Sequence, residues 1–303
     1  MKQNFKKIFN NVVEQIKKLY PGVCLIVLQG SQNYNLDDDQ SDVDVKVFVV
    51  PTVEDLLYCR YVENATVVTD GGLAEVKDIR RLPELLKKAN PTYIELLFSK
   101  MVWTAPCFED VWNKHIKRKG QKLIEERSNS FFNATRGMIL QKMSSIFKRT
   151  EGNSKMFDEF GYNPKDLCHA ARLVKILEDV NQQRKNGFTD WSYRKILRRN
   201  DDFNKYLRLL KREKLNIEEV KEISRNILHK VQYLYQEELN KVENVSDETI
   251  NEIEKKVIDY FCFSMIYFYM KYSGNQIEIY NAIKRKEEVD LILFEKLWKS
   301  QIK

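Results

Sequence analysis

Cysteine is scarce and scattered in this sequence. Its five cysteines form no C-x-x-C pair, their number is odd, and they stand far apart along the 303 residues. This spacing excludes the ligand pattern of a zinc cage and gives no sign of a disulfide framework. We therefore expect reduced thiols and a cytoplasmic protein. The cysteines are Cys24, Cys59, Cys107, Cys168 and Cys262.

Long apolar runs are missing as well. The most apolar stretch, residues 260–272 (YFCFSMIYFYMKY), is shorter than the roughly 20 residues that cross a bilayer. The first 16 residues follow an amphipathic helical pattern and lack the apolar centre of a signal peptide. These absences predict no membrane partner and no targeting segment, and we interpret residues 260–272 as a buried helix.

Neither sign of charge dominates strongly. Lys and Arg number 51 against 44 Asp and Glu, which gives a net charge of +7. This surplus suits a polyanionic partner, but ordinary solvated helix surface accounts for it equally well. The same two interpretations apply to the basic run at residues 194–199 (RKILRR), which lies near Trp191 and Tyr193. Nucleic-acid contact there is one hypothesis, and a solvated helix face is the other.

The hydrophobic pattern changes once along the chain. Short apolar runs with the content of strands occupy residues 23–29 and 43–50, and a third candidate begins at Leu73. Beyond Pro106, apolar residues recur at helical spacing and strand-like alternation disappears. The pattern predicts an α/β (α+β) fold, with a small mixed-sheet domain over residues 1–115 and an all-helical domain over residues 116–303.

The residues that carry chemistry lie at the ends of the first two predicted strands. Gly30 and Ser31 follow the first strand, where a glycine turn lets backbone N–H groups and a hydroxyl approach a phosphate. Asp42, Asp44 and Lys46 alternate with valines, so they share one face of the second strand. Two neighbouring carboxylates repel unless a cation lies between them, and Mg²⁺ prefers oxygen ligands. Each pattern alone is common, but together they predict a phosphate turn facing a metal pair.

This order of motifs resembles the polymerase-beta-like nucleotidyltransferase superfamily, in a branch of predicted bacterial and phage nucleotidyltransferases. The likeness spans roughly residues 23–180 and includes three further stretches. The branch usually has a second glycine four residues after the serine, where this chain has Asn35. Asparagine tolerates left-handed backbone better than most residues, so the turn can survive the change. The three stretches are residues 76–82 (VKDIRRL), 88–98 (KANPTYIELLF) and 161–173 (GYNPKDLCHAARL).

The resemblance implies roles for these residues. Gly30 and Ser31 would hold nucleotide phosphates, while Asp42 and Asp44 would bind two Mg²⁺ ions, with Mn²⁺ as a possible substitute. A third acid is expected from a neighbouring strand, and strand parity puts Glu75 and Asp78 on opposite faces. We prefer Asp78, because it closes its segment directly before a helix, and keep Glu75 as the alternative.

A basic stripe is expected on the helix that contains residues 161–173. Lys165, His169 and Arg172 fall at i, i+4 and i+7, hence along one face. Together with Lys46, these residues would bind the nucleotide. The alternative is that His169 packs between helices and the two cations are solvated.

The sequence thus predicts an enzyme that moves an NMP from an NTP, most simply ATP, to an acceptor hydroxyl and releases pyrophosphate. The acceptor would be RNA, a protein or a small molecule. The competing hypothesis is a non-catalytic nucleotide- or nucleic-acid-binding module of a toxin–antitoxin or defence pair, which the intact pair Asp42 and Asp44 disfavours.

Overall fold

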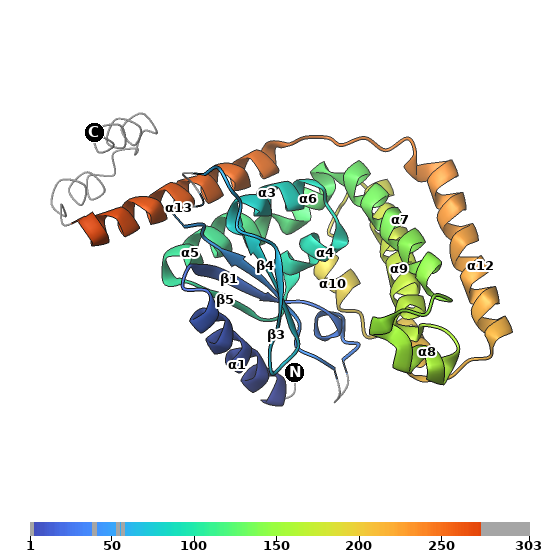
Figure 1. Ribbon diagram of the computed structural model, residues 1–303. Coiled ribbons are helices and arrows are strands. Elements are labelled where there is room, and N and C mark those ends of the chain that lie inside the picture. The colour runs from blue at the N-terminus through green and yellow to red at the C-terminus, as the bar shows by residue number, and fades with distance from the viewer. Residues whose placement is uncertain (1–2, 38–40, 53–54, 56–57, 274–303) are drawn as a thin grey trace. The chain divides into compact units, whose positions relative to one another are not determined.

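Five strands form one mixed sheet in the computed structural model, which describes residues 3–37, 41–52, 55 and 58–273. The strand order is β3-β4-β2-β1-β5 (Figure 1). β1 runs antiparallel to both β2 and β5, β2 is parallel to β4, and β3 is antiparallel to β4. The strands are β1 (Val23–Leu28), β2 (Val45–Val49), β3 (Ala65–Val68), β4 (Leu73–Asp78) and β5 (Val102–Thr104).

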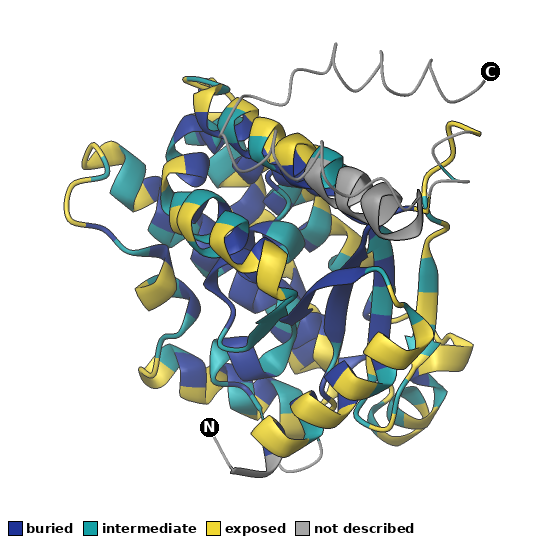
Figure 2. Ribbon diagram, turned by 90° about the vertical axis from the view of Figure 1, so that its left-hand side faces the viewer, coloured by how far each residue is buried: buried dark blue, intermediate teal, exposed yellow. Residues whose placement is uncertain are grey.

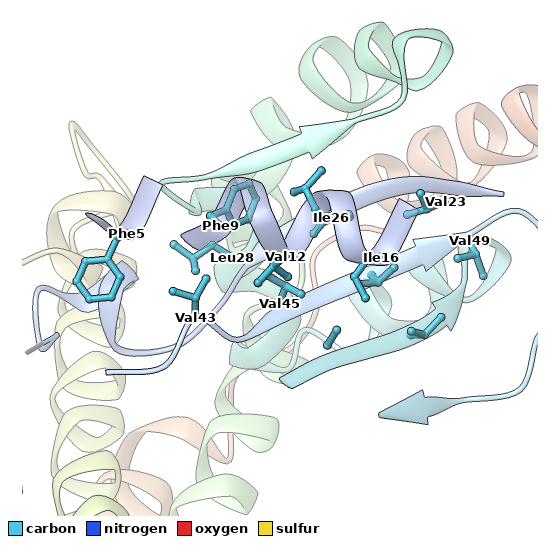
Figure 3. Packing of buried hydrophobic residues seen from close by; sticks show 14 residues of the cluster. Phe5, Phe9, Val12, Ile16, Val23, Ile26, Leu28, Val43, Val45 and Val49 are labelled. Atoms are coloured by element: carbon cyan, nitrogen blue, oxygen red, sulfur yellow. The ribbon is translucent and has the colours of Figure 1, made fainter. Parts of the chain in front are cut away.

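The helix α1 (Gln3–Leu19) covers one face of this sheet. Its amphipathic pattern places Phe5, Phe9, Val12 and Ile16 on one side, and all four are buried. Figure 3 shows these side chains packed against valines and isoleucine of β1 and β2. The alternating valines of β2 therefore point toward α1. The polar residues between them must point to the opposite face.

Helices account for the remaining regular structure in the described residues. Between β4 and β5 lie η2 (Ile79–Arg81), α3 (Leu82–Lys87), α4 (Pro91–Ile94) and η3 (Glu95–Phe98). The elements after β5 are α5 (Pro106–Asp110), η4 (Val111–Ile116), η5 (Lys117–Lys119), α6 (Gly120–Glu126), α7 (Ser128–Ser145), η6 (Glu151–Asn153), α8 (Ser154–Phe160), α9 (Pro164–Lys185), α10 (Tyr193–Leu197), α11 (Asp202–Arg212), α12 (Ile217–Leu234), η7 (Tyr235–Leu239) and α13 (Glu248–Ser273).

The long helices α7, α9 and α12 pack side by side (Figure 1), and α10 and α11 contact α9. Figure 2 shows the central strands and the inner sides of these helices as buried, with exposed residues on the outer sides of the helices. Residues 1–257 form one compact unit, and residues 258–303 form a second. The predicted boundary between residues 115 and 116 remains a prediction.

The predicted fold class is confirmed. The three predicted strands correspond to β1, β2 and β4, and only helices follow Thr104 in the described residues. The strand β5 was not predicted, because a half-buried edge strand of three residues carries too short a pattern. Among the described residues, no helix combines the length and the apolar character needed to cross a bilayer.

Candidate active site

The Gly30–Ser31 turn lies at the end of β1. Gly30 has a φ of 90°, a conformation that a residue with a Cβ rarely adopts. Ser31 then begins the short helix η1 (Ser31–Tyr34), and its side chain is partly exposed. The buried Asn33 holds the turn in place, because its amide donates to the Leu28 carbonyl at 2.8 Å. Its amide oxygen accepts the Lys100 N–H at 3.0 Å.

The aspartate pair lies directly beside this turn. The Gln29 N–H donates to the Asp44 carbonyl at 2.9 Å, and the Gln32 side chain donates to the Asp42 carbonyl. Asp42 is exposed, and Asp44 is partly buried. Asp44 Oδ1 accepts the Leu73 N–H at 2.9 Å, which fixes this side chain against β4. The predicted juxtaposition of the turn and the acids is therefore present.

Glu75 shares a sheet face with these acids. In the parallel register of β2 and β4, Lys46 lies opposite Glu75, and the two side chains form an ion pair. Lys46 itself is only 4% exposed and lies 5.6 Å from the centre of the Tyr93 ring. Burial lowers the pKa of Lys46, against the opposing effect of its hydrogen bond to Glu75. Burial raises the pKa of Glu75, but Lys46, together with a hydrogen bond from Gln29 and the charge of Lys77, outweighs it and the net shift is downward. Lys46, expected to bind nucleotide, thus faces Glu75.

The expectation that Asp78 lies with Asp42 and Asp44 is wrong. Asp78 pairs in register with Val49, at the far end of β2 from Asp44, and on the α1 side of the sheet. It is fully buried and caps η2 by accepting the Arg80 N–H at 2.9 Å. It also accepts the Val62 N–H at 3.0 Å and pairs with the Arg80 guanidinium at 2.7 Å. The acid before a helix start is a structural cap here.

The donor set on the open face suits a hard divalent cation. Asp42 and Asp44 supply oxygen ligands, and neither forms an ion pair with a described residue. Glu75 supplies a third carboxylate on the same face, but its partner is Lys46. In the described part of the chain, no three His, Cys, Asp or Glu side chains are already gathered as a metal site. The chemistry of the acids therefore fits Mg²⁺ or Mn²⁺ through the aspartate pair.

Asn35 closes the turn in the left-handed conformation, with a φ of 58°. Residues far along the chain hold it there. Its side chain accepts from Lys100 Nζ at 2.7 Å and donates to the Arg198 carbonyl at 2.9 Å. Its carbonyl accepts from the Arg208 guanidinium at 2.6 Å. Two longer contacts of 3.4 Å complete the set: Asn204 donates to the same carbonyl, and the Asn35 side chain donates to the Arg199 carbonyl. Five polar contacts thus hold the asparagine in the left-handed conformation that a glycine would adopt more easily.

A buried charged network connects the turn to α9. Arg172 pairs with Glu95 at 2.8 Å, and both side chains are almost fully buried. The Arg172 guanidinium also stacks on the Tyr34 ring at 3.8 Å. The Tyr34 hydroxyl completes the network by donating to Glu95 at 2.6 Å. Burial of this hydroxyl raises the pKa of Tyr34. Neither Tyr34 nor Glu95 was proposed from the sequence, although Glu95 lies in the 88–98 stretch that carries the family resemblance.

The three residues of the predicted basic stripe have different surroundings, because only Arg172 and His169 take part in this buried network. Arg172 reaches the turn through Tyr34, as expected of that helix face, but its guanidinium is engaged by Glu95. His169 contacts Arg172 at 3.0 Å, and its buried Nδ1 has no hydrogen-bond partner among the residues that the structure describes. Burial lowers the pKa of His169, and the charges of Arg172 and Lys142 lower it further. Lys165 is exposed to solvent. Nucleotide binding by the three remains a prediction.

Comparisons with known proteins agree with the geometry. Residues 1–259 match the family described as "RlaP: RNA repair pathway DNA polymerase beta family". A comparison with curated proteins finds no match. Among solved structures, a nucleotidyltransferase-like protein from Exiguobacterium sibiricum is similar at 13% identity, with 86% of this chain and 89% of that chain covered. Its TM-score of 0.28 is too low to carry an argument about fold or site.

Proposed function

Because this chain belongs to the RNA repair pathway DNA polymerase beta family, we propose that it transfers a nucleotidyl group from an NTP to an acceptor hydroxyl. One observation carries the proposal: the Gly30–Ser31 turn and the Asp42–Asp44 pair are joined by hydrogen bonds at one end of the sheet. A turn that accepts phosphates beside acids that bind a cation suits a triphosphate. ATP is the first nucleotide to test.

In this proposal, the turn binds the phosphates and the acids bind the cations. The Gly30–Ser31 turn offers a hydroxyl and a close backbone approach to the β- and γ-phosphates. Asp42 and Asp44 hold the divalent cations, and Glu75 is the third acid on their face once its contact with Lys46 is exchanged. Bound Mg²⁺ would neutralise the charge that develops on the attacking and leaving oxygens.

The reaction is a displacement at phosphorus. The acceptor oxygen forms a bond to the α-phosphorus, and the bond from that phosphorus to the oxygen bridging the β-phosphate breaks. Pyrophosphate leaves with the electron pair of that bond. The hydroxyl proton passes to a neighbouring carboxylate, for which Glu75 is the candidate because it lies on the face of Asp44, and then to water.

We propose RNA as the acceptor. The support is the description of the family, which names an RNA repair pathway, together with the net charge of +7. A terminal hydroxyl of an RNA strand supplies the nucleophile that the displacement needs. A protein or small-molecule hydroxyl would meet the same chemical requirement, so the experiment below includes acceptor-free reactions.

Pyrophosphate release tests the function. Purified protein is incubated with Mg²⁺ and each NTP in turn, with and without single-stranded RNA, and we expect release with at least one NTP when RNA is present. The matched variant is Asp42→Asn with Asp44→Asn, because asparagine at position 44 keeps an oxygen for the Leu73 N–H. We expect this variant to fold normally and to release no pyrophosphate above background.

Two outcomes would contradict the proposal. Release that is unaffected by the double variant would place the chemistry elsewhere in the protein. No release with any NTP, combined with specific NTP binding, would support the competing hypothesis of a non-catalytic nucleotide-binding module.

A further inference from the structure

Four basic side chains gather beside the Gly30–Ser31 turn, outside the aspartate pair. Lys100 directly precedes Met101, whose carbonyl accepts the Leu28 N–H at the end of β1 at 3.0 Å. The Arg198 guanidinium donates to the Phe98 carbonyl, two residues before Lys100. Asn35 joins them, because it accepts from Lys100 and donates to the Arg198 carbonyl. We name Lys100, Lys117, Arg194 and Arg198 the basic cluster.

Lys117 and Arg194 extend the basic cluster away from the turn. The short helix η5, which contains Lys117, packs against η3, which ends at Phe98. The positive charges of Arg194 and Arg198 both act on Lys117, and burial together with these charges lowers the pKa of Lys117. Burial and the charge of Arg194 also lower the pKa of Arg198. The four cations are therefore near enough to repel one another.

Acids do not neutralise this repulsion. Within the described residues, none of the four cations forms an ion pair, although the charge of Asp37 acts on Lys100. The neighbouring Arg199, by contrast, pairs with Asp179 at 3.0 Å and with Asp201 at 2.9 Å. Like charges held together without counter-charges are unfavourable unless an anion binds. Within the basic run at residues 194–199, Arg199 is therefore neutralised by ion pairs, whereas Arg194 and Arg198 have no ion-pair partner among the described residues.

The position and chemistry of the basic cluster point to one ligand. We propose that it binds the phosphodiester backbone of the RNA acceptor and leads the reactive end of the strand to the aspartate pair, an inference that rests on the proposed function. β5 lies on the far side of β1 from β2, and Lys100 comes shortly before β5, so the cluster begins on the side of β1 away from the strand that follows Asp44. Phosphates upstream of the reacting hydroxyl would pass over this surface.

The contact should be independent of base sequence. Trp191 and Tyr193 border the basic run but are buried in an aromatic group with Phe98 and Phe131, so they offer no face for base stacking. Without a stacking surface, we expect the contacts of these cations to go mainly to phosphates, which carry no sequence information. We expect RNA strands of different sequence and equal length to bind with similar affinity.

Binding of a fluorescein-labelled single-stranded RNA, measured by fluorescence anisotropy over a series of salt concentrations, tests the proposal. The test variant is Lys117→Gln with Arg194→Gln, because neither side chain holds the turn. The matched control is Lys18→Gln with Lys155→Gln, two exposed lysines that lie outside the cluster and remove the same charge. For single strands, each lost phosphate contact lowers the salt slope of log affinity by about 0.7, so the test variant should lose about 1.4.

The control variant should keep the slope of the wild-type protein. An equal loss of slope in both variants, or none in the test variant, overturns the proposal, as does a loss of NTP binding without a loss of RNA binding. The Asp42→Asn and Asp44→Asn double variant separates the two proposals. It should bind RNA as the wild-type protein does and transfer no nucleotidyl group. If the wild-type protein itself binds RNA through the cluster but transfers no nucleotidyl group from any NTP, the proposed function fails and the RNA-binding proposal stands.

Discussion

Glu75 and Asp78 are three residues apart on β4 and have different surroundings. Glu75 lies on the face of Asp44 and is 37% exposed at its side chain, whereas Asp78 lies on the α1 side of the sheet and is fully buried. Strand parity had already placed them on opposite faces, but parity alone does not say which face is open. The helix α1 covers the face of Asp78, so the face of Glu75 is the open one.

Replacing Glu75 should impair activity more than stability. In Glu75→Gln the amide oxygen still accepts a hydrogen bond from Lys46, but the negative charge is lost. We expect the rate of nucleotidyl transfer to fall about a hundredfold, which corresponds to ~2.7 kcal/mol of barrier. The free energy of unfolding should change by less than ~1 kcal/mol, since the pair is partly exposed. Steady-state kinetics and urea unfolding measure the two effects, and full turnover in this variant would remove Glu75 from the site.

Replacing Asp78 should have the opposite result. Asp78→Ala removes a fully buried carboxylate that accepts the Val62 N–H and pairs with the Arg80 guanidinium. We expect a loss of ~3 kcal/mol in the free energy of unfolding, with little change in the rate per folded molecule. Urea unfolding combined with kinetics at low temperature checks this. A stable variant that is inactive would restore Asp78 as a catalytic acid.

At the scale of elements, one buried ion pair joins the helix α9 to η3, and Tyr34 connects this pair to the turn after β1. Arg172→Met leaves the Glu95 carboxylate buried without its cation, and we expect a cost of ~3 kcal/mol in the free energy of unfolding. Adding Glu95→Leu removes the uncompensated charge, so the double variant should recover part of that loss. Urea unfolding of the two single variants and the double variant measures the coupling. Additive losses would show that the pair does not act as a unit.

The same part of α9 should respond to pH through His169. Its folded-state pKa lies well below the ordinary value of 6.5, because burial and the nearby positive charges disfavour the imidazolium. Between the folded and the ordinary pKa, only the unfolded chain binds the proton, so stability falls as the pH drops below about 6.5. In His169→Gln this contribution is absent. We expect a flatter dependence of Tm on pH in this window, and equal slopes for both proteins would contradict the assignment.

Sequence patterns predicted the elements that are long or strictly alternating. The valines of β2 identified the buried face, and the Gly-Ser and Asp-x-Asp patterns placed the turn and the acids at adjacent strand ends. The edge strand β5 was too short for such a pattern. The Arg172–Glu95–Tyr34 network could not be predicted from the sequence either. Glu95 is 61 residues from Tyr34 and 77 residues from Arg172, and the three meet only through tertiary packing. Local periodicity carries no information about such partners.

At the scale of the whole molecule, the compact unit of residues 1–257 should be stable by itself. Ile250, Ile253 and Val257 of α13 are buried, and these belong to that unit. A chain that ends after Tyr260 keeps them, and it also keeps every residue that matches the family. We expect its free energy of unfolding to change by less than ~1 kcal/mol. Urea unfolding followed by circular dichroism measures this, and loss of a cooperative transition would show that residues 261–303 are required.

The hydrogen bond from Arg208 to the Asn35 carbonyl has a consequence for the synthesis of the protein. These partners are 173 residues apart, so at roughly 5–20 residues per second the ribosome adds Arg208 about 9–35 s after Asn35. During that interval the nascent chain already contains Asp42 and Asp44, but the turn beside them lacks the contacts of Arg198, Asn204 and Arg208 that help to hold Asn35 in its left-handed conformation. A ribosome-bound fragment that stops before Arg198 would therefore carry the acids without an ordered phosphate turn, and nucleotidyl transfer would begin only when translation is nearly finished.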